Sequence, residues 1–151
     1  MTISYQVEEF TDATSLTRVV KECIDSYAEH WLLGPNKYGP AFNPDIDGTV
    51  RSVSERTRVF ISARRAGKIV GLQNWYMGVN QDVRTERIAY MTGLGRKDNG
   101  VDLKEFVRFG VDAMRKAGAT RTVLAARVGV ATMRPLFESI GARAVDVMME
   151  V

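Results

Sequence analysis

The chain has 151 residues, 45% of them hydrophobic, and its 21 basic and 18 acidic residues give a formal net charge of +3. This length and apolar content predict a single domain, 1–151, that folds on its own, and they exclude a disordered chain. The basic residues are scattered among acidic ones, so the charge does not indicate a nucleic-acid partner.

The cysteine count and the hydropathy pattern restrict the compartment. Cys23 is the only cysteine, which excludes an intrachain disulfide and fits a reducing environment. The N-terminal segment lacks the pattern of a signal peptide, and no stretch reaches the ~18 apolar residues of a membrane span. No cluster of cysteine and histidine indicates a metal site. We therefore expect a cytoplasmic protein with neither a membrane partner nor a metal.

The first third of the chain predicts a strand, two helices and a long loop. Alternation over residues 3–10 is typical of a strand, and apolar residues at helical spacing from Leu16 to Trp31 indicate a helix that Gly34 and Pro35 end. Residues 33–48 hold three of the four prolines, so we expect an irregular loop with a functional role. A second, short helix is expected over 50–57.

The remainder predicts an antiparallel meander followed by a βαβ arrangement. Strands are expected over 59–63, 69–76 and 87–92, with a hairpin turn at 64–68 and a polar loop at 78–85. A helix that ends at Gly118, a strand over 120–126, a helix over 132–140 and a strand over 144–151 follow. This order predicts an α/β fold of the mixed α+β kind. Its central sheet is mixed and mostly antiparallel, with helices on both faces.

The segment RKDNGVDLKEFVRFG, residues 96–110, runs from a glycine-containing loop into a helix. An open helix N-terminus has unpaired N–H donors and a positive dipole end, which suit a phosphate group. Asp102 and Glu105 also fit a capping box, in which case the helix caps itself and the loop binds nothing. The residues alone leave both interpretations open.

This order of elements resembles the GNAT fold of acyl-coenzyme A-dependent N-acyltransferases, and most closely the small GNAT-like proteins of phage genomes. Three stretches carry the resemblance: FNPDIDG (42–48), VFISARRAGKIVGLQNWY (59–76) and LFESIGA (136–142), which matches the family's Leu-Tyr-x-x-x-Gly-Phe. The resemblance covers nearly the whole chain. It implies transfer of an acetyl group from acetyl-coenzyme A to an amine acceptor, either a small molecule or a protein, and a tendency to form homodimers.

The resemblance also implies a cofactor site. In the family, the loop after the fourth strand reads Gln/Arg-x-x-Gly-x-Gly/Ala, and its backbone N–H groups hold the coenzyme A pyrophosphate, while the fourth strand holds the pantetheine arm. The implied cofactor-binding residues are Met91, Thr92, Lys97, Asp98, Asn99, Gly100, Val101 and Asp102. Asp102 replaces the family's small residue, and its carboxylate competes with phosphate for the same N–H groups.

Acyl transfer to an amine needs a base for the amine proton and a donor that polarises the thioester carbonyl. The family's fourth-helix tyrosine, which protonates the leaving thiolate, is replaced here by Phe137. The candidate catalytic residues are Glu86 just before the cofactor strand, His30 beside the proline-rich loop, and Tyr90 within that strand. The candidate substrate contacts are Tyr38 in the loop and the strand neighbours Trp75 and Tyr76, which point to opposite faces.

Three departures favour a rival interpretation. Asp102, Phe137 and the absence of a carboxylate within the cofactor strand are typical of a catalytically degenerate GNAT-like protein. Such a protein would be a virion component or an inhibitor that binds a host protein, and it would be found in the virion or the host cytoplasm. Modification of nucleic acid is a third class, but no basic-aromatic stripe supports it.

Overall fold

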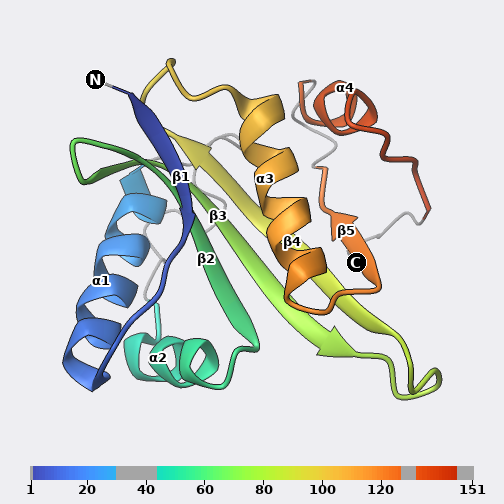
Figure 1. The fold of residues 1–151 in the computed structure, drawn as a ribbon, viewed down its shortest axis with the longest axis horizontal. Coiled ribbons are helices and arrows are strands. Elements are labelled where there is room, and N and C mark those ends of the chain that lie inside the picture. Colours follow the sequence, from blue (N-terminus) through green and yellow to red (C-terminus); the bar gives the residue numbers. More distant parts are fainter. Residues whose placement is uncertain (1, 30–43, 127–131, 146–151) are drawn as a thin grey trace.

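The computed structural model describes residues 2–29, 44–126 and 132–145 (Figure 1). The elements are β1 (Ile3–Val7), α1 (Ala13–Glu29), α2 (Ile46–Ser54), β2 (Arg58–Arg65), β3 (Lys68–Val79), β4 (Arg87–Arg96), α3 (Leu103–Lys116), β5 (Arg121–Leu124) and α4 (Met133–Glu138). These nine elements appear in the predicted order. The tenth, a strand over 144–151, falls largely outside the described residues.

The strands form one sheet in the order β1-β2-β3-β4-β5. The first four pair antiparallel and β5 joins β4 in parallel, so the predicted mixed, mostly antiparallel sheet is confirmed. A parallel pair needs a crossover, and α3 supplies it between β4 and β5. Both β3 and β4 run longer than the sequence pattern indicates, because their mutual pairing extends from Gly71↔Arg96 to Val79↔Arg87.

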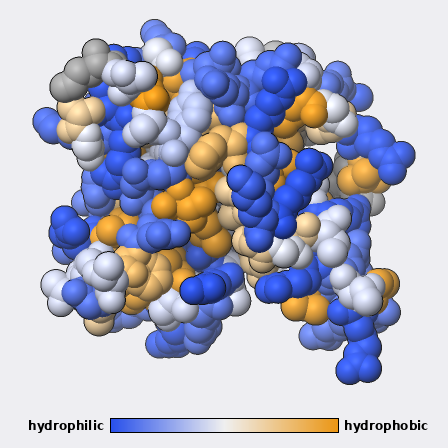
Figure 2. Space-filling model, viewed as in Figure 1, coloured by the Kyte–Doolittle hydropathy of each residue, from blue (hydrophilic) through white to orange (hydrophobic). Residues whose placement is uncertain are grey.

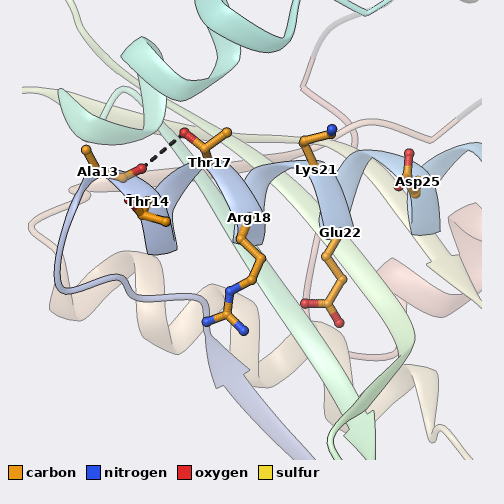
Figure 3. A pocket seen from close by; sticks show the side chains of 7 residues that line it. All are labelled: Ala13, Thr14, Thr17, Arg18, Lys21, Glu22 and Asp25. Carbon is orange, nitrogen blue, oxygen red and sulfur yellow. Dashed lines mark hydrogen bonds between the residues drawn. The ribbon is translucent and has the colours of Figure 1, made fainter.

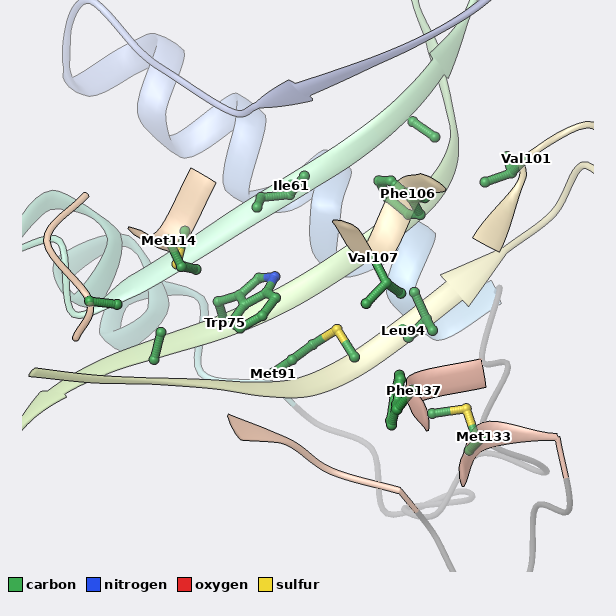
Figure 4. Packing of buried hydrophobic residues seen from close by; sticks show 13 residues of the cluster. Ile61, Trp75, Met91, Leu94, Val101, Phe106, Val107, Met114, Met133 and Phe137 are labelled. Carbon is green, nitrogen blue, oxygen red and sulfur yellow. The ribbon is translucent and has the colours of Figure 1, made fainter. Parts of the chain in front are cut away.

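Helices cover both faces of the sheet, as predicted. In β2, Phe60 packs with α1 and α2, while its neighbour Ile61 packs with α3 and α4, since successive side chains of a strand alternate between faces. Figure 4 shows the second of these clusters, to which the sheet contributes Trp75 and Met91 and α3 contributes Phe106 and Val107. The two apolar layers hold the strands between them, so the sheet is a rigid platform for groups on β4.

Helix α2 begins four residues earlier than predicted. Asp45 is its N-cap, and the Asp45 side chain accepts a hydrogen bond of 2.9 Å from the Gly48 N–H. The Thr49 hydroxyl donates to the Asp45 carbonyl at 2.7 Å. Periodicity of apolar residues could not reveal this start, because the first turn of α2 is fixed by polar capping contacts.

Helix α3 is docked on β3 by a polar contact within the apolar layer. The Gln73 amide donates from Nε2 to the Phe106 carbonyl at 2.6 Å, and Trp75 Nε1 donates to Gln73 Oε1 at 2.8 Å. Both side chains are fully buried. These contacts hold the start of α3 in a fixed place relative to β3.

At the other end of α3, Gly118 has φ +104°, which confirms the predicted C′ glycine.

A buried ion network ties β1, β2 and α1 together. The Glu8 carboxylate accepts from Arg64 Nε at 2.8 Å and from the Ser62 hydroxyl. Arg64 also makes a bidentate contact with Glu22 of α1, at 3.0 and 3.2 Å. Cys23 lies beside this network, and burial raises the pKa of its thiol far above the ordinary value. Cys23 is therefore an inert core residue, as predicted.

Candidate functional site

One side of β4 loses its partner partway along the strand. β4 pairs with β5 as far as Met91, which lies opposite Leu124, and the Ala125 N–H donates to the Met91 carbonyl at 3.2 Å. β4 itself continues to Arg96 (Figure 1). Among the described residues, no strand pairs with this side of β4 beyond Met91. Its backbone N–H and C=O groups there are the ones that a ligand could use.

Thr92 is the extra residue of a β-bulge at this point. The register of β3 and β4 passes from Trp75↔Met91 to Asn74↔Gly93, which leaves Thr92 without an opposite residue. A bulge bends its strand and changes the direction of the bulged side chain, and bulges are common next to active sites. The bulge and the parting of β4 from β5 thus coincide.

A chain of polar contacts runs from α2 to the bulge. Arg58 donates from Nε to Asn74 Oδ1 at 2.8 Å and from Nη1 to Thr49 Oγ1 at 3.0 Å. Asn74 then donates from Nδ2 to Thr92 Oγ1 at 3.0 Å. The Arg58 guanidinium also lies 5.2 Å from the centre of the Tyr76 ring. We call Thr49, Arg58, Asn74 and Thr92 the polar chain.

The loop between β4 and α3 binds one of its own carboxylates. Asp98 Oδ1 accepts from the Gly100 N–H at 2.7 Å, and Asp98 Oδ2 accepts from Arg65 Nε at 2.7 Å. The Gly100 N–H first, and then Arg65, hold the pKa of Asp98 below its usual value, so this carboxylate is ionised at neutral pH. An anion already occupies one donor of the loop.

Asp102 caps α3, as the capping interpretation predicts. Its side chain accepts from the Glu105 N–H at 3.1 Å, and its backbone is extended. The N–H groups of Leu103 and Lys104, the first two of the helix, form no hydrogen bond with the part of the chain that the structure describes. Capping therefore occupies one donor and leaves two others available.

Charges of both signs surround these two donors. Burial first, and then the charges of Glu105 and Asp102, raise the pKa of Tyr5, whose hydroxyl donates to the Asp102 carbonyl at 3.4 Å. Arg96 supplies a positive charge nearby, and its guanidinium donates to the Val101 carbonyl at 3.0 Å. The side chains of Lys97 and Lys104 are exposed nearby in the sequence. The helix start is thus close to charge balance.

A shallow, open hollow lies elsewhere, along α1. It is lined by Ala13, Thr14, Thr17, Arg18, Lys21, Glu22 and Asp25 (Figure 3). All seven residues come from successive turns of one helix, and the Thr17 hydroxyl donates to the Ala13 carbonyl within it. Because α1 packs on the opposite face of the sheet from α3, this hollow is separate from the β4–α3 loop. A hollow open along one helix lacks the enclosure of a typical ligand pocket.

Neither a family model nor a curated protein matches the chain. Solved structures do match. An aminoglycoside acetyltransferase from an uncultured soil metagenomic sample, in complex with sisomicin, has a TM-score of 0.73 and 12% identity over 99% of this chain and 93% of that one. A ribosomal-protein-alanine N-acetyltransferase from Brucella melitensis biovar Abortus 2308 has a TM-score of 0.65 and 17% identity over 99% and 98%.

A predicted acetyltransferase from Clostridium acetobutylicum, solved with acetyl-CoA, has a TM-score of 0.56 and 16% identity over 99% of this chain and 96% of that one. These similarities span both chains almost completely. The protein has the GNAT acetyltransferase fold. In this GNAT fold, β4 is the expected cofactor strand and residues 97–102 are the loop that the resemblance assigns to pyrophosphate.

The candidate catalytic residues are not gathered at this loop. Glu86 precedes β4, roughly 20 Å from Thr92 at about 3.3 Å per strand residue. Its carboxylate accepts from Asn80 at 2.5 Å and lies 3.8 Å from Arg121. Tyr90, 41% exposed, is only two residues before Thr92. His30 lies outside the described residues. A catalytic role for any of the three stays a prediction.

The two aromatic neighbours on β3 lie on opposite faces, as their adjacency predicts. Trp75 is fully buried against α3, so its position offers no surface to a substrate. Tyr76 is 40% exposed and lies on the face of the polar chain, beside Arg58. Tyr38 falls in the part of the chain outside the description. Phe137 is buried in the α3-side cluster, away from solvent.

Sequence reasoning assigned Asp98 to the cofactor loop but missed that its carboxylate occupies the loop itself. A local signal existed, because Asp-x-Gly is typical of a turn in which an aspartate accepts from the N–H two residues ahead. No local signal marked the polar chain. Arg58 and Asn74 are 16 residues apart and meet only through the pairing of β2 with β3.

Proposed function

We propose that the protein is an N-acetyltransferase that uses acetyl-coenzyme A and an amine acceptor. One observation carries the proposal: β4 parts from β5 at Met91 and leads to a helix start where the N–H groups of Leu103 and Lys104 are available. A free strand edge suits the amide groups of a pantetheine arm, and open helix amides suit a diphosphate. The similarity to acetyltransferases, one of them solved with acetyl-CoA, supports the same assignment.

The residues present fit this cofactor, and both cations and carboxylates lie near the diphosphate position. Arg96, Lys97 and Lys104 supply cations near the helix start, while Asp98 and Asp102 each occupy one N–H group. When bound, the cofactor supplies an activated acyl thioester. The chain would hold the diphosphate at α3 and the arm along β4. The amine proton would go to water or to His30, because Glu86 lies roughly 20 Å from Thr92 at about 3.3 Å per strand residue, too far to be reached through a single water.

Acetyl-coenzyme A is expected to raise the melting temperature. A ligand that binds only the folded state, at about 100 times its Kd, adds about 2.7 kcal/mol, which is several degrees for a domain of this size. Differential scanning fluorimetry measures the shift. Pantetheine, which lacks the diphosphate, is the control and should give a much smaller shift. Unchanged melting at millimolar acetyl-coenzyme A would overturn the proposal.

Removing either loop carboxylate is expected to strengthen cofactor binding. Asp98→Ala releases the Gly100 N–H and removes a negative charge from the loop, and Asp102→Gly releases the Glu105 N–H at little cost to the helix cap. We expect each variant to bind coenzyme A about tenfold more tightly, equivalent to about 1.4 kcal/mol. Isothermal titration calorimetry measures this. Asp112→Ala, an exposed change within α3, is the charge-matched control and should leave affinity unchanged. Equal affinity of all three variants and the parent would refute our account of the loop.

The proposal names the acceptor by its chemical class, an amine, and not as a particular compound. One similar structure contains sisomicin, and another is named for ribosomal-protein alanine, so small-molecule and protein amines are both represented among the similar folds. For this chain we propose that residues 33–48 and 77–86 select the acceptor. Acetylation assays with sisomicin and with a peptide bearing N-terminal alanine would separate the two classes. Homodimer formation, which the family resemblance implies, is tested by light scattering.

A second candidate function is favoured by the occupied loop. Three features would be expected of a GNAT fold without cofactor chemistry: Asp98 is held by Arg65, Asp102 caps α3, and Phe137 replaces a tyrosine. Such a protein would act in a phage virion or as an inhibitor bound to a host protein. Mass spectrometry of purified virions should then find the chain at a fixed copy number. Its absence from particles would count against the virion role.

A further inference from the structure

The hydrogen bonds of the polar chain have a defined direction. Arg58 has only donors, so the Asn74 atom that it contacts must be the amide oxygen. The Asn74 atom facing Thr92 is then the NH2 group, which also has only donors. The Thr92 hydroxyl therefore accepts this bond, and its own proton remains to be donated elsewhere.

The other members of the polar chain are held in place by hydrogen bonds to one another and to the Asp45 carbonyl. Thr49 Oγ1 accepts from Arg58 and donates to the Asp45 carbonyl. Asn74, 3% exposed, uses both ends of its amide. Of the two hydroxyl groups in the polar chain, that of Thr92 is the one whose proton has no acceptor in the part of the protein that the structure describes. Arg58 and Asn74 also keep N–H groups that the polar chain does not use. Because the Thr92 oxygen accepts from Asn74, the Thr92 proton must point away from Asn74.

The Thr92 hydroxyl lies at the point of β4 where the acyl transfer is proposed to take place. Thr92 is the bulged residue of β4, and it follows Met91, the last residue of β4 that pairs with β5. Its side chain is partly buried. Tyr76 and Tyr90 are exposed on the same face of the sheet, because they lie opposite each other in the β3–β4 ladder. A group bound along the free edge of β4 passes this hydroxyl.

We propose that the Thr92 hydroxyl donates a hydrogen bond to the carbonyl oxygen of the acyl thioester, and that Asn74 and Arg58 are positioning residues for it. The proposal rests on the proposed acetyl transfer. In that reaction the amine nitrogen bonds to the carbonyl carbon and releases one proton to water, the carbon–sulfur bond breaks, and the sulfur takes one proton from water. Thr92 keeps its proton throughout and stabilises the negative charge that develops on the carbonyl oxygen.

The direct readout is the carbonyl stretch of bound acetyl-coenzyme A labelled with carbon-13 at the thioester carbonyl, measured by difference infrared spectroscopy. A hydrogen bond lowers this frequency. We expect a lowered frequency on the wild type, its return towards the free value on Thr92→Val, and a lowered frequency again on Thr92→Ser. Valine has the shape of threonine without the hydroxyl, so packing is nearly unchanged. Loss of one such donor costs about a hundredfold or more in rate.

Asn74→Asp tests the direction of the polar chain. The new carboxylate still accepts from Arg58, but it now also accepts the proton of Thr92 and so turns it away from the ligand. We expect this variant to lose the lowered frequency while its melting temperature stays near that of the wild type. If Thr92→Val does not fold, Asn74→Asp carries the test alone.

The outcomes separate the two proposals. If the wild type does not bind acetyl-coenzyme A, both fail. If it binds and either Thr92→Val or Asn74→Asp keeps the lowered frequency, the role of Thr92 fails and the acetyltransferase proposal stands. A polar chain that only braces the bulge would alter the melting temperature in these variants without moving the carbonyl frequency.

Discussion

Arg64→Met is expected to lower the free energy of unfolding by about 3–5 kcal/mol, because it leaves the Glu8 carboxylate buried without its cation. The Glu8 side chain is 4% exposed and that of Arg64 is 13% exposed, so water cannot replace the lost partner. The Ser62 hydroxyl and the Gln6 amide still contact Glu8, but neither carries a charge. Urea denaturation at equilibrium measures the change.

Two controls identify burial as the cause. Arg134→Met removes an arginine from a surface pair with Glu138, whose side chains are 73% and 50% exposed, and should cost no more than about 0.5 kcal/mol. Adding Glu8→Gln to Arg64→Met removes the unpaired charge and should restore part of the stability. If Arg64→Met and Arg134→Met destabilise equally, the network around Glu8 does not stabilise the fold as proposed.

The fold could be predicted from the sequence because its signals are local. Alternation in β1, helical spacing in α1 and α3, and a glycine after α3 each depend on a few neighbouring residues. The same holds for Asp102, which caps the N–H of a residue three positions ahead. Where the signal was polar instead of periodic, as at the start of α2, the predicted boundary was displaced by four residues.

The contacts that shape the candidate site are set by tertiary pairing. Arg65 reaches Asp98 across 33 residues, and Asn74 reaches Thr92 across 18, both through strand register that no local pattern specifies. The bulge at Thr92 is likewise a property of how β3 and β4 align. Sequence reasoning proposed a cofactor loop and a cofactor strand. It could not tell which of their donors and acceptors were already used, and that decides the chemistry.

Gly110→Ala is expected to destabilise the protein by about 2 kcal/mol, although alanine favours helices over glycine by about 1 kcal/mol. A Cβ at position 110 would lie 2.0 Å from Gln73 Oε1 and 2.9 Å from Gln73 Cδ. Gln73 cannot turn away without giving up its bonds to Trp75 and to the Phe106 carbonyl, and a buried polar group left unpaired costs about 1–3 kcal/mol.

A double-mutant cycle with Gln73→Ala tests this cause. In that background the added methyl group has room, so Gly110→Ala should become neutral or stabilising. Because Gln73 docks α3 one turn from its start, Gly110→Ala should also weaken coenzyme A binding by displacing the N–H groups of Leu103 and Lys104. Asp112→Ala, on the exposed side of α3, should change neither stability nor affinity appreciably. Loss of stability without loss of affinity would mean that the docking of α3 and the proposed diphosphate site are independent.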